Sequence, residues 1–216
     1  SKYAVKVMRE SELYNEKYMS ADVWDAAGVP DENGDSLPPG LTEGSVDVVI
    51  MIFIFSALAP NQWDQAIRNI YRLLKPGGRV LFRDYGRGDL AQVRFKKGRY
   101  MTENFYVRGD GTRVYFFDQD QLVDMWGTWS AENGLQIPIG DENATEEASE
   151  KTTDEPSAEA KQLAKEKGAF EVLNMGADRR LIVNRGTKQK MYRCWMQGNF
   201  LKRGGAKAEA ATESTQ

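Results

Sequence analysis

Residues 45–85 read SVDVVIMIFIFSALAPNQWDQAIRNIYRLLKPGGRVLFRDY, and this stretch decides the fold. Residues 46–55 form an almost unbroken apolar run, which is typical of a strand buried on both faces of a parallel sheet. Asn61 is the expected N-cap of the helix that follows, and the sequence KPGG ends that helix. Residues 79–83 are short and apolar enough to form the next parallel strand. The stretch therefore predicts one right-handed crossover unit of an open α/β sheet.

The carboxyl ends of these two strands are the expected functional edge, because ligands of open α/β sheets bind there. The ends fall at residues 52–56 and 83–85. Apolar side chains at helical spacing give the connecting helix one face to pack on the sheet: Trp63, Ala66, Ile67, Ile70 and Leu74. We expect Ile52 and Asp84 to face one shared cleft at this edge.

The residue types exclude several kinds of chemistry. The chain has no histidine, so a Ser/His or Cys/His nucleophilic site is excluded and an ordinary zinc or non-haem iron centre is disfavoured. The single Cys194 permits no internal disulfide, which suits a reducing compartment. No apolar run reaches membrane-spanning length and no signal peptide is evident. These observations predict a cytoplasmic protein with no metal and no membrane contact.

The charge is unevenly distributed along the chain. Its 29 Lys and Arg against 32 Asp and Glu give a formal charge of −3, which argues against a uniformly basic nucleic-acid binder. However, residues 79–113 hold nine basic and four acidic side chains, and residues 178–203 hold eight and one. Residues 141–160 reverse the balance, with one basic and eight acidic side chains. The acidic segment therefore offsets the two basic segments in the net charge of the chain.

Before the central unit, residues 1–15 predict a helix, residues 18–23 a short strand that contains Asp22, and residues 25–44 a loop. Because a helical pattern is already under way at Ser1, we expect the chain to be a fragment. At 216 residues it can bury one sizeable core, so we expect one domain over residues 1–203.

After the central unit, residues 86–100 predict a short helix and a loop. Two aromatic and β-branched runs around Gly109-Asp110-Gly111 predict a β-hairpin over residues 104–117. Asp118 can cap a helix whose inner face carries Leu122, Met125, Trp126 and Trp129. The acidic residues 141–168 predict a solvated insertion, and residues 204–216 a disordered tail. Residues 169–175 and 191–200 are the expected final strands.

Three segments together resemble one family, the tRNA N3-methylcytidine methyltransferases, which are class I enzymes that use S-adenosylmethionine. The segments are SVDVVIMIFIFSAL with LLKPGGRVLFRDYGRGDLAQ, then RFKKGRYMTENFYVRGDGTRVYFF, and DRRLIVNRGTKQKMYRCWMQ. LLKPGG recurs through class I methyltransferases, whereas FRDYG followed by NFYVRGDGTRVYFF is much more specific. The resemblance implies a Rossmann-like fold with a mostly parallel sheet and an added hairpin. It covers roughly residues 4–203, apart from the acidic insertion.

The resemblance also implies a substrate and a gap. DLAQ followed by RFKKG is most similar to the branch that acts on threonine tRNAs, so the expected partner is a threonine or serine tRNA, with an activating protein as a further candidate. The family carries a Gly-rich loop after its first strand and an acidic residue that ends its second. The 216 residues of this chain contain neither the loop nor the acidic residue. We therefore expect a partial domain that lacks two strands, is prone to aggregation and binds S-adenosylmethionine poorly.

Three residues match cofactor contacts of the family. The resemblance places Asp22, which Val23 follows, near the adenine amino group, and Ile52 against the adenine ring. By spacing alone, these residues are a loop aspartate and two core aliphatics, and that alternative stays open.

Asp84 is the candidate catalytic residue. Cytosine N3 already has a lone pair, so methyl transfer needs positioning more than a general base, and a carboxylate near the amino group would stabilise the developing cationic base. The alternative is a buried ion pair with Arg83 that only closes the strand end.

Basic residues interleaved with Phe95, Tyr100, Phe105 and Tyr106 suit backbone phosphates and unstacked bases. The candidate RNA-binding residues are Arg83, Arg94, Lys96, Lys97, Arg108 and Arg113, and a second patch is formed by Arg179, Arg180 and Arg185. A solvated basic face over aromatic core residues is the alternative.

Two other functions remain open: a catalytically silent RNA-binding subunit and a small-molecule methyltransferase.

Overall fold

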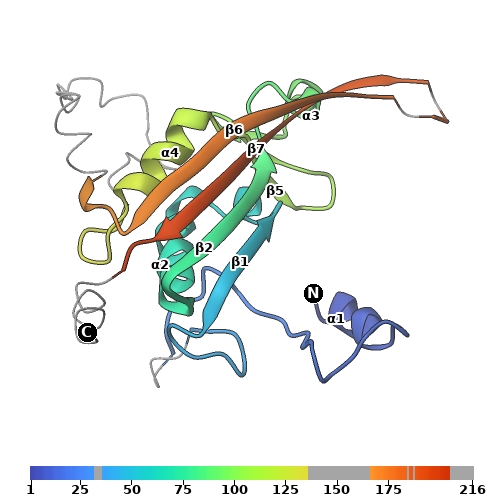
Figure 1. The fold of residues 1–216 in the computed structure, drawn as a ribbon. Coiled ribbons are helices and arrows are strands. Elements are labelled where there is room, and N and C mark those ends of the chain that lie inside the picture. The colour runs from blue at the N-terminus through green and yellow to red at the C-terminus, as the bar shows by residue number, and fades with distance from the viewer. Residues whose placement is uncertain (32–35, 136–165, 184, 187, 205–216) are drawn as a thin grey trace, which may run out of the picture.

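The predicted crossover unit is present in the computed structural model, which describes residues 1–31, 36–135, 166–183, 185–186 and 188–204 (Figure 1). The strands β1 (Val46–Ile52) and β2 (Leu74–Tyr85) run parallel. Two 3-10 turns, η1 (Phe55–Ala57) and η2 (Pro60–Gln62), and the helix α2 (Trp63–Leu73) connect them.

The boundaries of α2 differ from the predicted ones at both ends. Gln62 rather than Asn61 precedes the helix, because Pro60 opens a 3-10 turn first. The KPGG sequence belongs to β2, which begins at Leu74. At this end Lys202 donates hydrogen bonds to the carbonyl oxygens of Tyr71 (2.8 Å) and Leu74 (2.7 Å). Burial lowers the pKa of Lys202, and its ammonium stabilises the end of the helix.

The larger sheet has the order β1-β2-β7-β6. The strands β6 (Phe170–Val183) and β7 (Lys190–Lys202) confirm the two predicted final strands and are longer than expected. β7 is antiparallel to both of its neighbours. Beyond the pair of Tyr85 and Trp195, β6 is the only strand that pairs with β7 in the described chain, and the two strands leave the sheet as a projecting ribbon (Figure 1).

The predicted hairpin is also present. The strands β4 (Phe105–Val107) and β5 (Arg113–Tyr115) pair antiparallel, and β3 (Tyr100–Thr102) adds a third strand that was not predicted. The short helix α3 (Leu90–Val93) precedes them, and α4 (Gln119–Thr128) follows Asp118. Within the described residues the Asp118 side chain makes no capping hydrogen bond, contrary to the prediction, and pairs with Arg87 instead. All four apolar residues predicted for the inner face of that last helix are buried.

The two faces of the larger sheet differ in burial. Figure 1 shows α2 and α4 behind the sheet, where they cover one face. On that face Met51 of β1 is 4% exposed, whereas Val48, Ile50 and Ile52 on the other face are 47%, 63% and 52% exposed. The prediction that this strand is buried on both faces is therefore wrong for the described residues, because no described element covers the second face.

The N-terminal segment departs from the prediction. The helix α1 (Lys2–Arg9) is shorter than expected, and residues 18–23 form no strand. β1 pairs only with β2 in the described chain, so this segment gains no backbone ladder. The predicted insertion and tail lie almost wholly outside the described residues. Within them, no helix combines the length and apolar character needed to cross a membrane.

The open face can be tested with two neighbouring substitutions on β1. Ile50→Lys places a charge on an exposed position, so we expect less aggregation by light scattering and a free energy of unfolding within about 0.5 kcal/mol of the original. Met51→Lys is the matched control on the covered face, where a buried charge should cost at least about 3 kcal/mol. Equal destabilisation by both variants would contradict the open face.

Candidate functional site

The turn that follows β1 is held by a buried carboxylate. Asp84 is 0% exposed, and its two oxygens accept hydrogen bonds from the backbone N–H groups of Ser56 (2.9 Å) and Tyr85 (2.8 Å). The indole N–H of Trp63 also donates to the carbonyl of Phe55 at 3.2 Å. Because these bonds supply partners for the buried polar groups, the chain can leave the strand and begin a 3-10 turn without leaving those groups unpaired.

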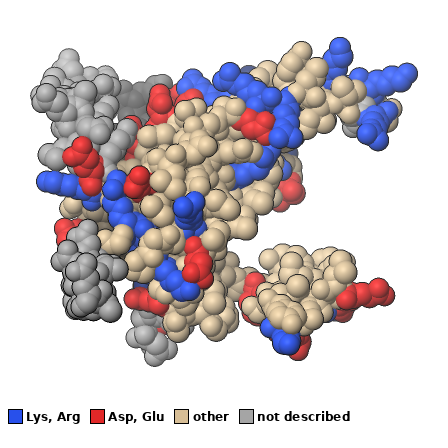
Figure 2. All heavy atoms as spheres, viewed as in Figure 1, with Lys and Arg blue, Asp and Glu red and all other residues tan. Residues whose placement is uncertain are grey.

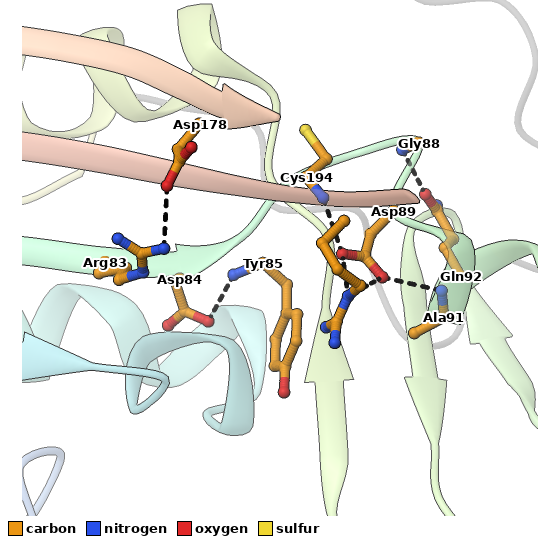
Figure 3. Close-up of polar contacts among 10 residues, drawn as sticks. Arg83, Asp84, Tyr85, Gly88, Asp89, Ala91, Gln92, Asp178 and Cys194 are labelled. Carbon is orange, nitrogen blue, oxygen red and sulfur yellow. Dashed lines mark hydrogen bonds and ion pairs between the residues drawn. The ribbon is translucent and has the colours of Figure 1, made fainter. Parts of the chain in front are cut away.

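Burial raises the pKa of Asp84 from 3.8 to about 6, and the hydrogen bonds to Ser56 and Tyr85 oppose that rise. Arg83 is not the partner of this carboxylate, so the alternative of an Asp84–Arg83 ion pair is wrong. Instead, the Arg83 guanidinium crosses β7 to reach Asp178 on β6, at 3.0 Å (Figure 3).

Ile52 and Asp84 do not share a cleft in the described chain. Ile52 stands opposite Arg83 in the parallel ladder and is 52% exposed on the open face. Asp84 is the next residue along β2, so its side chain points to the covered face, because neighbouring side chains of a strand alternate. The two strand ends are adjacent as predicted, but these two side chains lie on opposite faces of the sheet.

The predicted cofactor residues are also separated. Asp22 accepts a hydrogen bond from the Arg9 guanidinium of α1 at 2.7 Å. Asp22 and Val23 line a pocket of about 450 Å³ together with α1 residues, and Ile52 is not among its lining residues. The described geometry therefore does not assemble Asp22, Val23 and Ile52 into one cofactor site.

The first basic segment surrounds α3 and the hairpin. Arg94, Lys96 and Lys97 are exposed, whereas Arg113 is half-buried and donates to the Gln62 side chain at 3.0 Å. Arg108 lies over the ring of Tyr85, at 5.3 Å from the ring centre.

The aromatic residues interleaved with this segment divide between core and surface. Phe105 is 1% exposed and belongs to the core, as the alternative interpretation expected. Phe95 and Tyr106 are half-buried and stack on each other at 4.8 Å, and Tyr100 is 62% exposed.

The second basic segment follows the projecting ribbon. Arg179, Arg180 and Arg185 are exposed there, and Figure 2 shows Lys and Arg side chains gathered along the ribbon and around its base. Arg180 pairs with Asp178 at 2.9 Å, and this hydrogen bond, followed by the one from Arg83, lowers the pKa of that carboxyl. Ribbon residues 179–193 contain six basic side chains and no acidic one.

Sequence reasoning missed Asp89, which is 0% exposed. Its carboxylate caps α3 by accepting from the N–H of Ala91 (2.8 Å), and it also accepts from the N–H of Cys194 (2.8 Å) and from Arg193 Nε (2.8 Å) (Figure 3). An aspartate just before a short helix is a recognisable N-cap signal. The contacts with β7 join residues more than one hundred positions apart and left no local signal.

Comparison with known proteins identifies the class. The methyltransferase domain family matches residues 9–80. A solved S-adenosylmethionine-dependent methyltransferase from Methanosarcina mazei superimposes with a TM-score of 0.50 at 14% identity, covering 94% of this chain and 77% of that one. The fold is therefore that of a class I methyltransferase, as the strand order and crossover unit indicated.

Two relatives match most of this chain in sequence. The chain is 46% identical to the tRNA(Thr) (cytosine(32)-N(3))-methyltransferase of Saccharomyces cerevisiae over 91% of its length. It is 43% identical to the tRNA N(3)-methylcytidine methyltransferase trm140 of Schizosaccharomyces pombe over 94%. These matches make the chain a homologue of the tRNA N(3)-cytidine methyltransferases. It spans 24% of the first relative and 51% of the second.

The buried Asp84 should make stability depend on pH. Because its pKa rises from 3.8 to about 6 on folding, the folded state retains a proton that the unfolded chain has released between these values. Stability is therefore lost as the pH rises through that window. We expect the free energy of unfolding, relative to an Asp84→Asn variant, to fall by about 3 kcal/mol across it.

Denaturant unfolding of both proteins at a series of pH values measures this difference. Asp120→Asn, at an exposed position in the first turn of α4, controls for the change in net charge. If the free energy of unfolding of the wild type minus that of Asp84→Asn stayed constant from pH 3 to about pH 7, Asp84 would not titrate as its burial requires.

Proposed function

We propose that this chain contributes to a tRNA methyltransferase that transfers a methyl group from S-adenosylmethionine to N3 of a cytidine in the anticodon loop. The observation that carries the proposal is the 46% identity, over 91% of the chain, to an enzyme named for cytosine 32 of a threonine tRNA. The class I fold supports S-adenosylmethionine as the methyl donor. A threonine or serine tRNA is the proposed substrate, in the cytoplasm, and an activating protein partner is a further proposal.

The proposed reaction places modest demands on side-chain chemistry. Cytosine N3 carries its own lone pair, so the protein must orient the base and exclude water more than remove a proton. Asp22, Val23 and Ile52 do not form one cofactor site among the described residues, and no step is assigned to them.

Asp84 is proposed to act through position. Its carboxylate holds the N–H of Ser56 and so fixes the turn between the strand end and η1. A catalytic role for Asp84 at the cytosine amino group stays a prediction, and in the described geometry its oxygens accept from the backbone N–H groups of Ser56 and Tyr85 beneath the turn. Either role requires the carboxylate, so replacing it should impair methylation.

The function is tested in cells that lack the gene encoding this chain. We expect mass spectrometry of tRNA nucleosides to show loss of N3-methylcytidine in these cells. The wild-type gene should restore it, whereas Asp84→Asn should restore less than a tenth of the wild-type level. Asp120→Asn, the same change at an exposed site, should restore it fully.

Unchanged N3-methylcytidine in the deletion strain would reject the proposed function. If the purified wild-type protein bound tRNA without methylating it, the silent RNA-binding subunit would take its place, and absence of tRNA binding would favour a small-molecule methyltransferase. Full restoration by Asp84→Asn would reject any role for that carboxylate in the reaction.

The basic patches predict a strong salt dependence of tRNA binding. Replacing Arg94, Lys96 and Lys97 by alanine should reduce the slope of log Kd against log salt by about 2, because each lost phosphate contact removes roughly 0.7 to 0.9. Fluorescence anisotropy with a labelled anticodon stem-loop measures this slope.

Alanine replacement of Lys2, Lys6 and Lys17 is the matched control, because it removes the same charge from exposed positions at the N-terminal end. An equal change of slope in both triple variants would indicate that net charge, and not the patch, determines binding.

A further inference from the structure

Three aromatic rings meet on the open face at the strand ends. Phe53 follows β1, Tyr85 ends β2, and Trp195 lies opposite Tyr85 on β7. The Phe53 ring is 4.8 Å from that of Tyr85, at an interplanar angle of 35°, and 6.2 Å from that of Trp195. All three side chains are half-buried, so the cluster remains accessible. We call these three residues the aromatic platform.

The backbone of Phe53 is strained to place its ring there. Its φ is +55°, a left-handed conformation that costs a bulky residue of the order of 1 kcal/mol or more. The N–H of Phe53 donates to the carbonyl of Arg83 at 2.8 Å, and the Asp84–Ser56 bond fixes the turn just beyond it. Backbone strain that surrounding bonds maintain is concentrated at functional sites.

Hydrogen-bond donors and positive charge surround these rings. Arg193 lies 5.8 Å from the Tyr85 ring and 5.2 Å from the Trp195 ring, and Arg83 lies 4.5 Å from the latter. Arg108 lies over Tyr85 and has no ion-pair partner among the residues that the structure describes. The indole N–H of Trp195 is buried and has no acceptor within the same residues.

This combination selects a type of ligand. The Arg108 guanidinium over Tyr85 would repel a cationic ligand, although aromatic rings alone can bind one. An unpaired nucleotide fits both features, because a base can stack on a ring while its phosphate accepts from an Arg donor. Arg83 and Arg193 already pair with Asp178 and Asp89, so Arg108 carries the charge left for a phosphate.

We propose that the aromatic platform stacks an unpaired base of the bound RNA, and that Arg108 holds the adjacent phosphate. This inference rests on the proposed function for the identity of the RNA. It goes further by naming four functional positions that the sequence left unassigned or assigned only to general RNA contact. Phe53, Tyr85 and Trp195 had no role, and Arg108 gains a specific one beside Asp84, which positions the turn.

Photo-crosslinking tests the platform directly. An anticodon stem-loop RNA with 4-thiouridine at single loop positions is irradiated with the chain, and the cross-linked peptides are identified by mass spectrometry. We expect cross-links to Phe53, Tyr85 or Trp195 from a loop position, and none from the same analogue placed in the stem. Cross-links confined to the hairpin or the ribbon would overturn the proposal.

Affinity provides a second measurement. Tyr85→Leu should weaken stem-loop binding about tenfold, as expected for one lost base–ring stack, and Phe53→Asn should act similarly because Asn tolerates the left-handed backbone. Arg108→Gln should lower affinity and reduce the salt slope by about 1. Tyr71→Leu removes a ring on the covered side and controls for lost stability, which thermal melts monitor for every variant.

The outcomes separate this proposal from the proposed function. Platform cross-links in a protein whose gene deletion leaves N3-methylcytidine unchanged would retain the platform and reject the enzyme. If an azido-adenosine analogue of the cofactor labels these rings and RNA does not, the platform binds the cofactor base and the proposal is wrong. Unchanged RNA affinity in both Tyr85→Leu and Phe53→Asn would also reject it.

Discussion

The hydrogen bond from the N–H of Ser56 to the carboxylate of Asp84, at 2.9 Å, joins the ends of the two parallel strands. A carboxylate with no exposed surface is costly unless it accepts hydrogen bonds, and here the backbone of the turn supplies them. The same bond fixes the turn that begins at Phe53. Because side chains alternate along β2, the inward position of Asp84 also sends Arg83 and Tyr85 to the open face.

The sheet therefore separates two environments. On the covered face aromatic rings pack closely, as in the parallel stack of Trp126 on Phe200 at 4.5 Å and 7°. On the open face rings alternate with guanidinium groups, and Arg83 spans β7 to reach Asp178. The first environment excludes water and stabilises the fold, whereas the second presents charge and ring surfaces to a ligand. The ribbon of β6 and β7 extends the same basic character away from the sheet.

Much of the fold could be predicted because its signals are local. The apolar run of β1, the helical spacing in α2 and the Gly-Asp-Gly turn each lie within a few residues of one another. Less of the candidate site could be predicted. Asp84 was recognised from its place at a strand end, but its backbone partners were not predicted. Phe53, Asp89 and Trp195 were not considered, because their contacts join β1, β2, α3 and β7.

By itself, the sequence determined the crossover unit, the hairpin, the final pair of strands and the family resemblance, since periodicity, turn residues and motifs are written along the chain. Only the tertiary structure decided which face of the sheet each side chain occupies and which charged side chains form ion pairs. Alternation along a strand makes a shift of one residue reverse the face, so Ile52 and Asp84 separate although their strands are neighbours. Long-range pairs such as Arg83 with Asp178 depend on strand order, which no local pattern encodes.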